Sequence, residues 1–525
     1  MFKSKIVFVF KVLMIISFIT PVLAETITPK QVLENYFDAA ITGNWQRAEV
    51  YWSPQDIKKA NRLGIKYTGQ KFKYDSNSPI IQYLENIRAG VAKIDILQID
   101  KNSDYWKATI RLISANDSIE YTYYIINANN NFYLTSRINL FTQNWNSVNT
   151  RYANVIFSDS SLINTYALKK LDEFIQKTCQ TFAIPSTKMK KLEKNKIDYF
   201  LCNQNEMKLL TGYDAHGITN LQFDAIISRH LPHPHELIHL LINYSLEDLP
   251  LYTLPLLQEG LAVAYGGRWC KEPEIVMQLS PFIISENICK LRDLLSQSSF
   301  NKIMPDISYP VSGAFSHMLI TNYGIDSLKK IYLLLSGSFN EIQKLTKNNI
   351  VNIFQQTYGT EWETLESDFK LHLKQFELND LVPGISKNGK YISEFRNKNQ
   401  LVTIYETDDT YEFIIKSKMP NPSGLILFKN SPKLFSEKYK SRLYNEQFPD
   451  KRYTKSEYGI IFNNKEVGFY NYSTDCLEAK HVSSFLPNMD YWDSETSTIY
   501  FSLKKSALDF EWNAYDIKLL ELLTP

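Results

Sequence analysis

The first patterned segment of the chain predicts an amphipathic helix near residue 28. The run Thr28-Pro29-Lys30-Gln31 combines a threonine N-cap, a proline at the first helical position and a glutamine that can close a capping box. We expect this helix to continue to about Ala40 and to end at Gly43-Asn44. Alternating apolar and polar residues then predict four strands of a curved antiparallel sheet, near residues 94–99, 106–113, 119–126 and 132–140.

The same alternation returns in the C-terminal part of the chain. Pro383 and Gly384 punctuate its start, and hairpin turns are indicated at Asp408-Asp409 and Asn463-Asn464. We interpret residues 385–525 as a β-rich accessory domain, and its residues show no pattern that indicates chemistry.

The central part of the chain has a helical pattern instead. Pro232 and Pro234 prevent the preceding segment from being helical, whereas Pro234 suits a first helical position, so a helix is predicted to begin there and to include LIHLLIN. After further breaks at Pro250 and Pro255, the run LLQEGLAVAYGG predicts a second helix.

Length and charge limit the overall picture. A chain of 525 residues corresponds to roughly three domains. Its hydrophobic content of 44% is typical of a globular protein. The formal charge of +2, from 58 basic and 56 acidic residues, provides no basic field, so neither nucleic acid nor an anionic membrane surface is expected as a partner.

Residues 1–24 have the pattern of a signal peptide. Lys3, Lys5 and Lys11 supply positive charge, an apolar run covers residues 12–19, and Val22-Leu23-Ala24 resembles a cleavage site. The run is shorter than the roughly 20 residues of a spanning helix, although an uncleaved anchor is the alternative. We therefore expect an exported protein, periplasmic or secreted, with no stable membrane span after the signal is removed.

Five cysteines in an oxidising compartment favour disulfides. We expect Cys179 to pair with Cys202 and Cys270 with Cys289, which leaves Cys476 free. The alternative is that all five are buried free thiols. No CxxC spacing is present, so a thiolate zinc cluster is not predicted.

The sequence HPHELIHLL at 233–241 is the strongest chemical signal. His235 and His239 lie four residues apart, so both face the same side of the helix and can ligate one ion, while Glu236 beside them can act on a water. Glu259 follows His239 by twenty residues, and Gly260 after it would let the second helix approach the first. Two histidines, one glutamate and an open fourth position predict a catalytic zinc site.

These residues resemble the gluzincin metallopeptidases, in particular the peptidase-MA-like set, in which HExxH is followed by an EGxA helix. The resemblance covers about residues 150–377 and includes TGYDAHGITNLQFDAIIS as the edge strand above the cleft and residues 355–373 as the closing helical segment. It departs from the family at Leu256-Leu257, where an aromatic residue is common. It implies metal ligands His235, His239 and Glu259, with Glu236 as the general base.

The resemblance also implies a fold and an activity. We expect a multidomain α+β protein whose central domain, residues 148–380, is a mainly helical zincin-type peptidase domain with a small antiparallel sheet. The activity would be hydrolysis of peptide or protein substrates by zinc-activated water. The alternative is a non-catalytic binding or adaptor protein in which the zinc site is structural or inactive.

The N-terminal region, residues 25–147, resembles the cone-shaped nuclear-transport-factor-two-like fold in its element order and in aromatic residues such as Trp45 and Trp52. Such cones can hold ligands, but the pair Tyr121 and Tyr123 is more typical of core packing. We expect this domain, like the C-terminal one, to serve for packing or protein docking.

Other residues near the motif have less specific roles. We interpret His230 and His233 as part of a solvated loop before the helix, whereas His216 lies on a strand or its turn and is a candidate for lining the cleft. A second electrophile beside the metal is expected from the resemblance. The candidates are Tyr309, placed first because of its Ser-Tyr-Pro turn, and then His317, Tyr323 and Tyr265.

Overall fold

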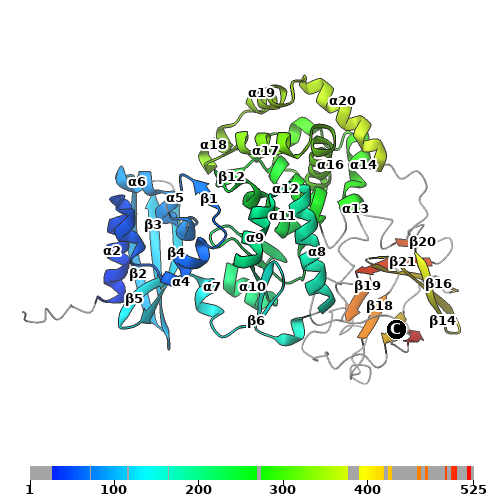
Figure 1. Ribbon diagram of the computed structural model, residues 1–525, viewed down its shortest axis with the longest axis horizontal. Helices are drawn as coiled ribbons and strands as arrows, with labels where there is room; N and C mark the ends of the chain where they lie inside the picture. Colours follow the sequence, from blue (N-terminus) through cyan, green and yellow to red (C-terminus); the bar gives the residue numbers. More distant parts are fainter. Residues whose placement is uncertain are drawn as a thin grey trace, which may run out of the picture. The chain divides into compact units, whose positions relative to one another are not determined.

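The protein is described by a computed structural model, with the helices and strands labelled in Figure 1. It covers residues 27–70, 72–114, 117–163, 165–268, 273–376, 389–408, 410–418, 424–428, 458–462, 467–470, 491–493, 498–504 and 517–521. The fold is mixed α+β with several small sheets. Its contacts divide the chain into two compact units, Met1–Ile57 with Asp75–Leu140, and Lys58–Tyr74 with Phe141–Pro525.

Some of the features predicted from sequence lie outside these residues. They are the signal segment 1–24, Cys270, Cys476, Asp409, and the turns Pro383-Gly384 and Asn463-Asn464. Among the residues that are described, no helix is both long and apolar enough to cross a bilayer.

The first unit begins with the predicted helix, α2 (Pro29–Ile41). Its capping box is formed, because Thr28 N–H donates to Gln31 Oε1 at 2.7 Å and Gln31 N–H donates to Thr28 Oγ1 at 3.3 Å. Gly43, with a φ of +75°, follows the helix end, so the predicted start and stop signals are both confirmed. Short helices follow, α3 (Trp45–Glu49), α4 (Pro54–Ala60), α5 (Pro79–Gln82) and α6 (Leu84–Arg88).

A four-stranded antiparallel sheet completes this unit, in the order β2 (Ala92–Lys101), β3 (Tyr105–Ser114), β4 (Asp117–Ala128) and β5 (Asn131–Thr135). Asn129 and Asn130 have φ values of 52° and 62°, as a tight hairpin turn between β4 and β5 requires. The fourth strand prediction was wrong beyond residue 135, where α7 (Arg137–Phe141) begins. The cause is Ser136, whose Oγ accepts the N–H of Asn139 at 3.0 Å and caps the helix.

A buried carboxylate lies in the core of the first unit. Oδ2 of Asp75, which is fully buried, accepts hydrogen bonds from Tyr36 at 2.5 Å, Ser78 at 2.9 Å and Tyr123 at 2.9 Å. Burial raises the pKa of Asp75 to about 7, although these three donors lower it. Tyr123 is 3% exposed, which confirms it as a core residue, whereas Tyr121 is half-buried.

The second unit is built on a five-stranded sheet in the order β6 (Asn146–Asn149), β7 (Ala153–Phe157), β8 (Ile197–Leu201), β10 (Ala225–Ser228) and β9 (Gly217–Asn220). The three central strands are parallel, and both edge strands are antiparallel to their neighbours. Every residue of β8 and β10 is buried, as expected for strands covered on both faces.

The segment Lys58–Tyr74 is anchored to this sheet by buried charges. Lys73 Nζ donates to the carbonyls of Ala60 at 3.0 Å and Ile65 at 2.9 Å, and it pairs with the buried carboxylate of Asp224 in the turn between β9 and β10. Arg62 pairs with Asp198 on β8. β1 (Lys66–Thr68) also pairs in parallel with β11 (Asp248–Pro250), which directly follows helix α11 (Pro234–Leu246). The segment therefore fixes both the β9–β10 turn and the C-terminal end of α11.

Helices make up most of the rest of this unit. They are α8 (Thr165–Thr181), α9 (Ser186–Asn195), α10 (Gln204–Thr211), α11 (Pro234–Leu246), α12 (Pro255–Gly266), α13 (Pro273–Met277), α14 (Leu279–Ser285), α15 (Gln297–Phe300), α16 (Pro305–Tyr323), α17 (Ile325–Leu334), α18 (Phe339–Lys344), α19 (Lys347–Tyr358) and α20 (Trp362–Leu373). A two-stranded sheet joins β12 (Tyr252–Thr253) to β13 (Ser336–Gly337).

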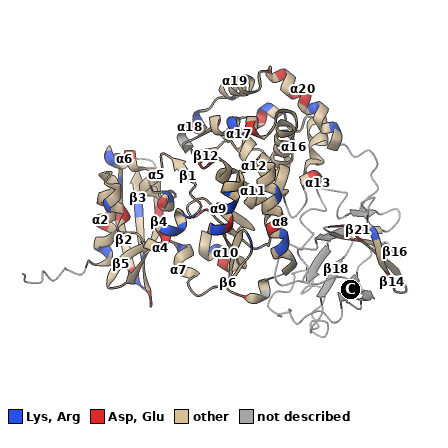
Figure 2. Cartoon of the chain, viewed as in Figure 1, with Lys and Arg blue, Asp and Glu red and all other residues tan. Residues whose placement is uncertain are grey.

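Charge is unevenly distributed among these helices. In Figure 2 acidic and basic residues are interspersed along the outer helices, such as α20, while α12 is almost wholly uncharged. The sequences of α11, α12 and α16 contain one acidic residue each, namely Glu236, Glu259 and Asp306, and no lysine or arginine. Since these helices contribute to the apolar core, the two half-buried glutamates on them are unusual and call for a chemical explanation.

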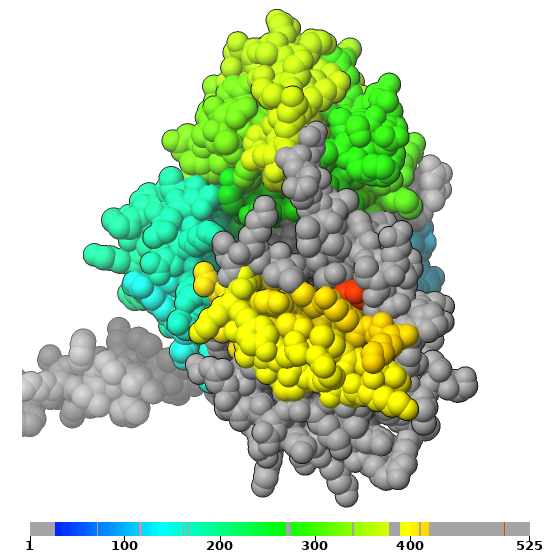
Figure 3. Space-filling view, turned by 90° about the vertical axis from the view of Figure 1, so that its right-hand side faces the viewer, coloured from blue at the N-terminus to red at the C-terminus, as the bar shows by residue number. Residues whose placement is uncertain are grey.

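After residue 389, the elements that are described are all strands. One sheet has the order β14 (Lys390–Arg396), β15 (Gln400–Glu406), β16 (Thr410–Ser417), β21 (Thr498–Lys504) and β20 (Tyr491–Asp493), and the other β19 (Val467–Tyr470), β18 (Tyr458–Phe462), β17 (Gly424–Phe428) and β22 (Ile517–Glu521). In Figure 3 the strands β14 to β16, drawn yellow to orange, form one continuous surface. On β15, Val402 and Ile404 alternate with half-buried residues.

The predicted disulfide between Cys179 and Cys202 was wrong, because both residues are free thiols. Cys179 packs in the main apolar core, whereas Cys202 Sγ lies 3.5 Å from the carbonyl oxygen of Ser228 on β10. Burial raises the pKa of each thiol to about 12. Cys289 is also a buried free thiol, and so the prediction that it pairs with Cys270 was wrong too.

Candidate metal centre

Helix α11 begins where the prolines predict it. Pro234 occupies the first turn, and the ring Nδ1 of His233 accepts the N–H of Glu236 at 3.4 Å, so a histidine serves as the N-cap. His235 and His239 lie one turn apart on the same helix and are both 9% exposed. Their ring centroids are 4.9 Å apart, so the two imidazoles converge as the spacing predicts.

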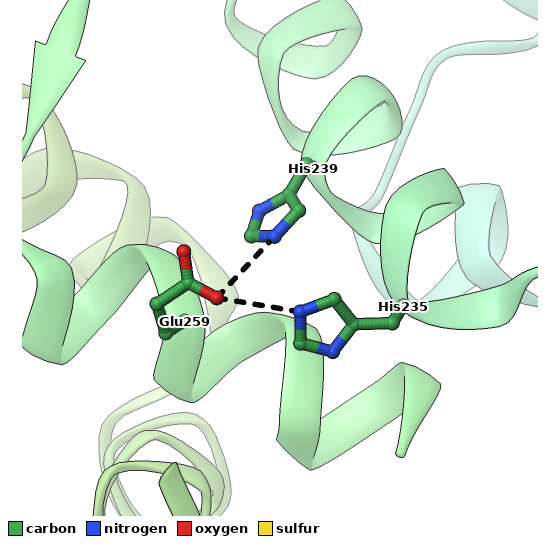
Figure 4. A group of neighbouring side chains, drawn as sticks. All are labelled: His235, His239 and Glu259. Carbon is green, nitrogen blue, oxygen red and sulfur yellow. Dashed lines mark hydrogen bonds and ion pairs between the residues drawn. The ribbon is translucent and has the colours of Figure 1, made fainter. Parts of the chain in front are cut away.

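Helix α12 brings the third predicted ligand to the same place. It begins at Pro255 and carries Glu259 in its second turn. Figure 4 shows the Glu259 carboxylate facing the two imidazoles, with one oxygen directed at both. Oε2 lies 3.3 Å from Nε2 of His235 and 3.6 Å from Nε2 of His239. The sequence-based expectation that these three side chains meet is therefore fulfilled in the fold.

Two glycines set the position of α12, and the role predicted for one of them was wrong. A Cβ at Gly260 would lie 2.4 Å from the carbonyl oxygen of Ser312, so this glycine allows close packing against α16, not against α11. Gly266 is the residue that allows α11 to approach, since a Cβ there would lie 2.7 Å from the backbone of His235. Glycine at both positions lets α12 fit between its two neighbours.

Two of the three donor-atom spacings match those of a tetrahedral zinc site. One nitrogen from each histidine and one oxygen of Glu259 all lie within 4.8 Å of one another. Zinc bonds of about 2.0–2.2 Å at tetrahedral angles place neighbouring ligand atoms roughly 3.3–3.5 Å apart, close to the 3.3 and 3.6 Å found here. Nδ1 of His235 lies 2.8 Å from the carbonyl oxygen of Gly267, the kind of contact that leaves Nε2 unprotonated for a metal.

The electrostatics of this cluster favour a cation. Burial raises the pKa of Glu259, but the neighbouring imidazoles of His239 and His235 outweigh it and hold that pKa well below its usual range. Burial lowers the pKa of His239, but the charge of Glu259 outweighs it and the pKa is raised. Each partner thus stabilises the charged form of the other, and a half-buried carboxylate facing two buried imidazoles is a site that attracts positive charge.

Glu236, the predicted general base, lies on α11 next to His235. Its Oε2 accepts hydrogen bonds from the backbone N–H of Thr219 at 2.7 Å and from the Thr219 hydroxyl at 2.8 Å. Burial raises its pKa, but the charges of His239, His233 and His235 and the hydrogen bond from Thr219 outweigh it, so the pKa lies below the ordinary value. Glu236 is thus an ionised, half-buried carboxylate beside the ligands, and it does not share their convergence point.

The edge strand beside α11 is shorter than predicted. Residues 218–228 form a hairpin, in which β9 is the sheet edge, residues 221–224 are the turn and β10 is interior. The turn forms because Asn220 Oδ1 accepts the N–H of Phe223 at 3.0 Å and Asp224 adopts a φ of 48°. Of the two hairpin strands, only β9 therefore lies at a sheet edge, where an added strand could pair.

Of the four candidates for a second electrophile, Tyr309 contacts a predicted ligand. Its ring stacks on that of His235 with centroids 6.3 Å apart. The prediction that Tyr309 lies in a turn was wrong, because α16 begins at Pro305 and Tyr309 lies inside this helix. Tyr265 and His317 pack against each other, His317 Nδ1 lies 3.0 Å from His372 Nε2, and Tyr323 donates a hydrogen bond to Asp368 at 3.3 Å.

Sequence reasoning missed two residues that lie beside the cluster. The guanidinium carbon of Arg268 lies 3.3 Å from the centre of the Tyr309 ring, in a cation–π stack. Burial lowers the pKa of Arg268, while the negative charges of Glu259 and Glu236 raise it. The sequence feature that could have identified Arg268 is its position directly after Gly266-Gly267, at the end of helix α12. Thr219 lies in the predicted strand segment, where the alternation of apolar and polar residues does not indicate a contact with Glu236.

The histidines before α11 were predicted to form a solvated loop, and this prediction was wrong. His230 is 4% exposed, and its Nε2 lies 3.2 Å from Nδ1 of the exposed His216. The rings of His230 and His233 are stacked with centroids 5.6 Å apart. His230 is buried because it follows the interior strand β10, where Tyr199 donates its hydroxyl to the His230 carbonyl.

No protein-family model matches the chain, and no curated protein is similar to it in sequence. What the site can do is therefore inferred from its own residues.

Proposed function

We propose that the protein is an exported zinc-dependent peptidase of the gluzincin type. The observation that carries this proposal is the convergence of Nε2 of His235, Nε2 of His239 and an oxygen of Glu259, with Glu236 ionised on the next position of the same helix. Two imidazoles and one carboxylate leave a fourth position open, as in catalytic zinc sites; structural sites use four protein ligands.

Zinc bound there would polarise the scissile carbonyl and lower the pKa of a water molecule to about 7. Glu236 would take one proton from that water as its oxygen forms a bond to the carbonyl carbon. When the carbon–nitrogen bond breaks, Glu236 would return the proton to the leaving nitrogen. Tyr309, a phenol that is protonated at neutral pH, would donate a hydrogen bond to the carbonyl oxygen as negative charge develops on it.

The proposal extends to the two other regions. We assign residues 148–380 to a zincin-type domain and residues 25–147 to a nuclear-transport-factor-two-like fold, supported by helices followed by the sheet β2-β3-β4-β5. The N-terminal and C-terminal regions would dock protein partners or substrate. An extended peptide would pair with the outer edge of β9 through the backbone of Gly217 and the carbonyl of Thr219, since the Thr219 N–H donates to Glu236 and the strand lies next to the metal helix.

Hydrolysis of an unfolded protein by the purified chain tests this function. We expect turnover that a chelator abolishes and zinc restores. Glu236→Gln should keep its zinc and lose about 10²- to 10⁴-fold in kcat, because amide replaces the proton acceptor. Glu247→Gln, at the C-terminal end of the same helix and paired with Lys188 at 3.1 Å, should keep full activity. A zinc-loaded wild-type protein without hydrolysis of any peptide bond would refute the proposal.

A further inference from the structure

Glu236 is held by the edge strand as well as by its own helix. The Thr219 hydroxyl lies 2.8 Å from Glu236 Oε2 and 2.7 Å from the Glu236 carbonyl oxygen, and the Thr219 N–H donates to Oε2 at 2.7 Å. A hydroxyl has one proton, so it satisfies one of these acceptors at a time. In either state the side chain of Thr219 remains tied to Glu236.

The register of β9 explains why Thr219 can reach this carboxylate. Thr219 pairs with Ile226 of β10, and Arg229 N–H donates to His216 O at 2.9 Å one residue beyond the ladder. Since hydrogen-bonded and non-hydrogen-bonded pairs alternate in an antiparallel ladder, the backbone groups of Gly217 and Thr219 point away from β10. The Thr219 N–H thus faces α11 without disrupting the sheet.

Gly217 makes the close approach possible. A Cβ on this residue would lie 2.5 Å from His233 Cδ2 and 3.0 Å from Glu236 Cγ. Only glycine leaves room for the helix at this point of the strand. The turn after β9 is held by the buried ion pair of Asp224 with Lys73. The position of β9 against α11 is therefore fixed at Gly217 before Thr219 and at this turn after it.

We propose that Thr219 is a positioning residue for the general base and that it determines which oxygen of Glu236 reacts. Oε2 is occupied by the amide and hydroxyl of Thr219, whereas no donor among the described residues reaches Oε1. Oε1 is therefore the oxygen that takes the proton of the attacking water and returns it to the leaving nitrogen. This inference rests on the proposed peptidase function.

A carboxylate held at one oxygen has one orientation, whereas a free one rotates about its last bond. Positioning by Thr219 thus contributes to kcat and leaves substrate affinity unchanged, because Thr219 acts through Glu236. A hydrogen bond to a charged group is lost in Thr219→Val, which keeps the shape of the side chain and its N–H. We expect kcat to fall roughly 10- to 100-fold, with KM changed less than about twofold.

The test compares Thr219→Val with Thr219→Ser, which keeps the hydroxyl, and with Ile218→Val, a control on the opposite face of the same strand. We expect Thr219→Ser and Ile218→Val to retain kcat, and every variant to hold one zinc. If Thr219→Val does not fold, Thr219→Ala takes its place. A second readout is the crystal structure of the zinc-loaded wild type, in which Oε2 should lie on Thr219 and Oε1 should face the metal.

The outcomes separate this inference from the proposed function. Wild-type kcat in a folded, zinc-loaded Thr219→Val would overturn the role of Thr219 while leaving the peptidase intact. A zinc-loaded crystal structure with Glu236 turned away from Thr219 would also overturn it. A wild-type protein that hydrolyses nothing would instead contradict the proposed function.

Discussion

Gly260→Ala is expected to loosen the metal centre without touching a ligand. The added Cβ would lie 2.4 Å from the Ser312 carbonyl oxygen and 2.4 Å from Ser316 Oγ, whereas ordinary contact begins at 3.4 Å. Because the carbonyl belongs to the α16 backbone, α12 and α16 must separate by about 1 Å. Overpacking of this kind costs about 1–3 kcal/mol, and the better helix propensity of alanine offsets about 1 kcal/mol of it.

The net expectation is a loss of up to about 2 kcal/mol in the free energy of unfolding, together with weaker zinc binding because Glu259 moves with the helix. Urea unfolding measures the first effect and competition with a chelator the second. Ser316→Ala is the control, since it removes a buried hydroxyl that has no hydrogen-bond partner at the same interface and adds no volume. A Gly260→Ala protein with wild-type stability and zinc affinity would refute the close packing that places Glu259.

Three further predictions concern single groups. His235→Ala should abolish zinc binding, and elemental analysis showing one zinc per chain would contradict the ligand assignment. The pKa of Asp75 is raised from 3.8 to about 7, so its protonated form stabilises the folded state by roughly 4 kcal/mol. This contribution is fully present below pH 4 and is lost as pH rises through 7. Urea unfolding of Asp75→Asn between pH 5 and 8 should lack this pH dependence. Cys179, Cys202 and Cys289 should resist a thiol reagent until the protein unfolds, and fast labelling of the native protein would disagree with their burial.

The ligand positions could be predicted because they follow from local geometry. A spacing of four residues places His235 and His239 on one helix face in any fold. Glu259 could be predicted because Pro255 starts a new helix just before it, and a connector of this length allows that helix to return. The capping box at Thr28 is equally local, and it formed as the sequence indicates.

The remaining contacts depend on packing between distant segments. Gly260 faces α16 and Gly266 faces α11, and no sequence pattern tells which neighbour a glycine will meet. His230 is buried because β10 lies inside the sheet, a fact of strand order. Cys179 and Cys202 are near in sequence, yet each lies in its own buried environment as a free thiol. The sequence spacing of two cysteines alone does not tell whether they meet.

The most direct test of the metal centre is an anomalous difference map at the zinc edge from crystals of the wild-type protein. We predict a peak about 2.0–2.2 Å from Nε2 of His235, Nε2 of His239 and an oxygen of Glu259. A map without a zinc peak between these three side chains, or with zinc held by other residues, would contradict the account.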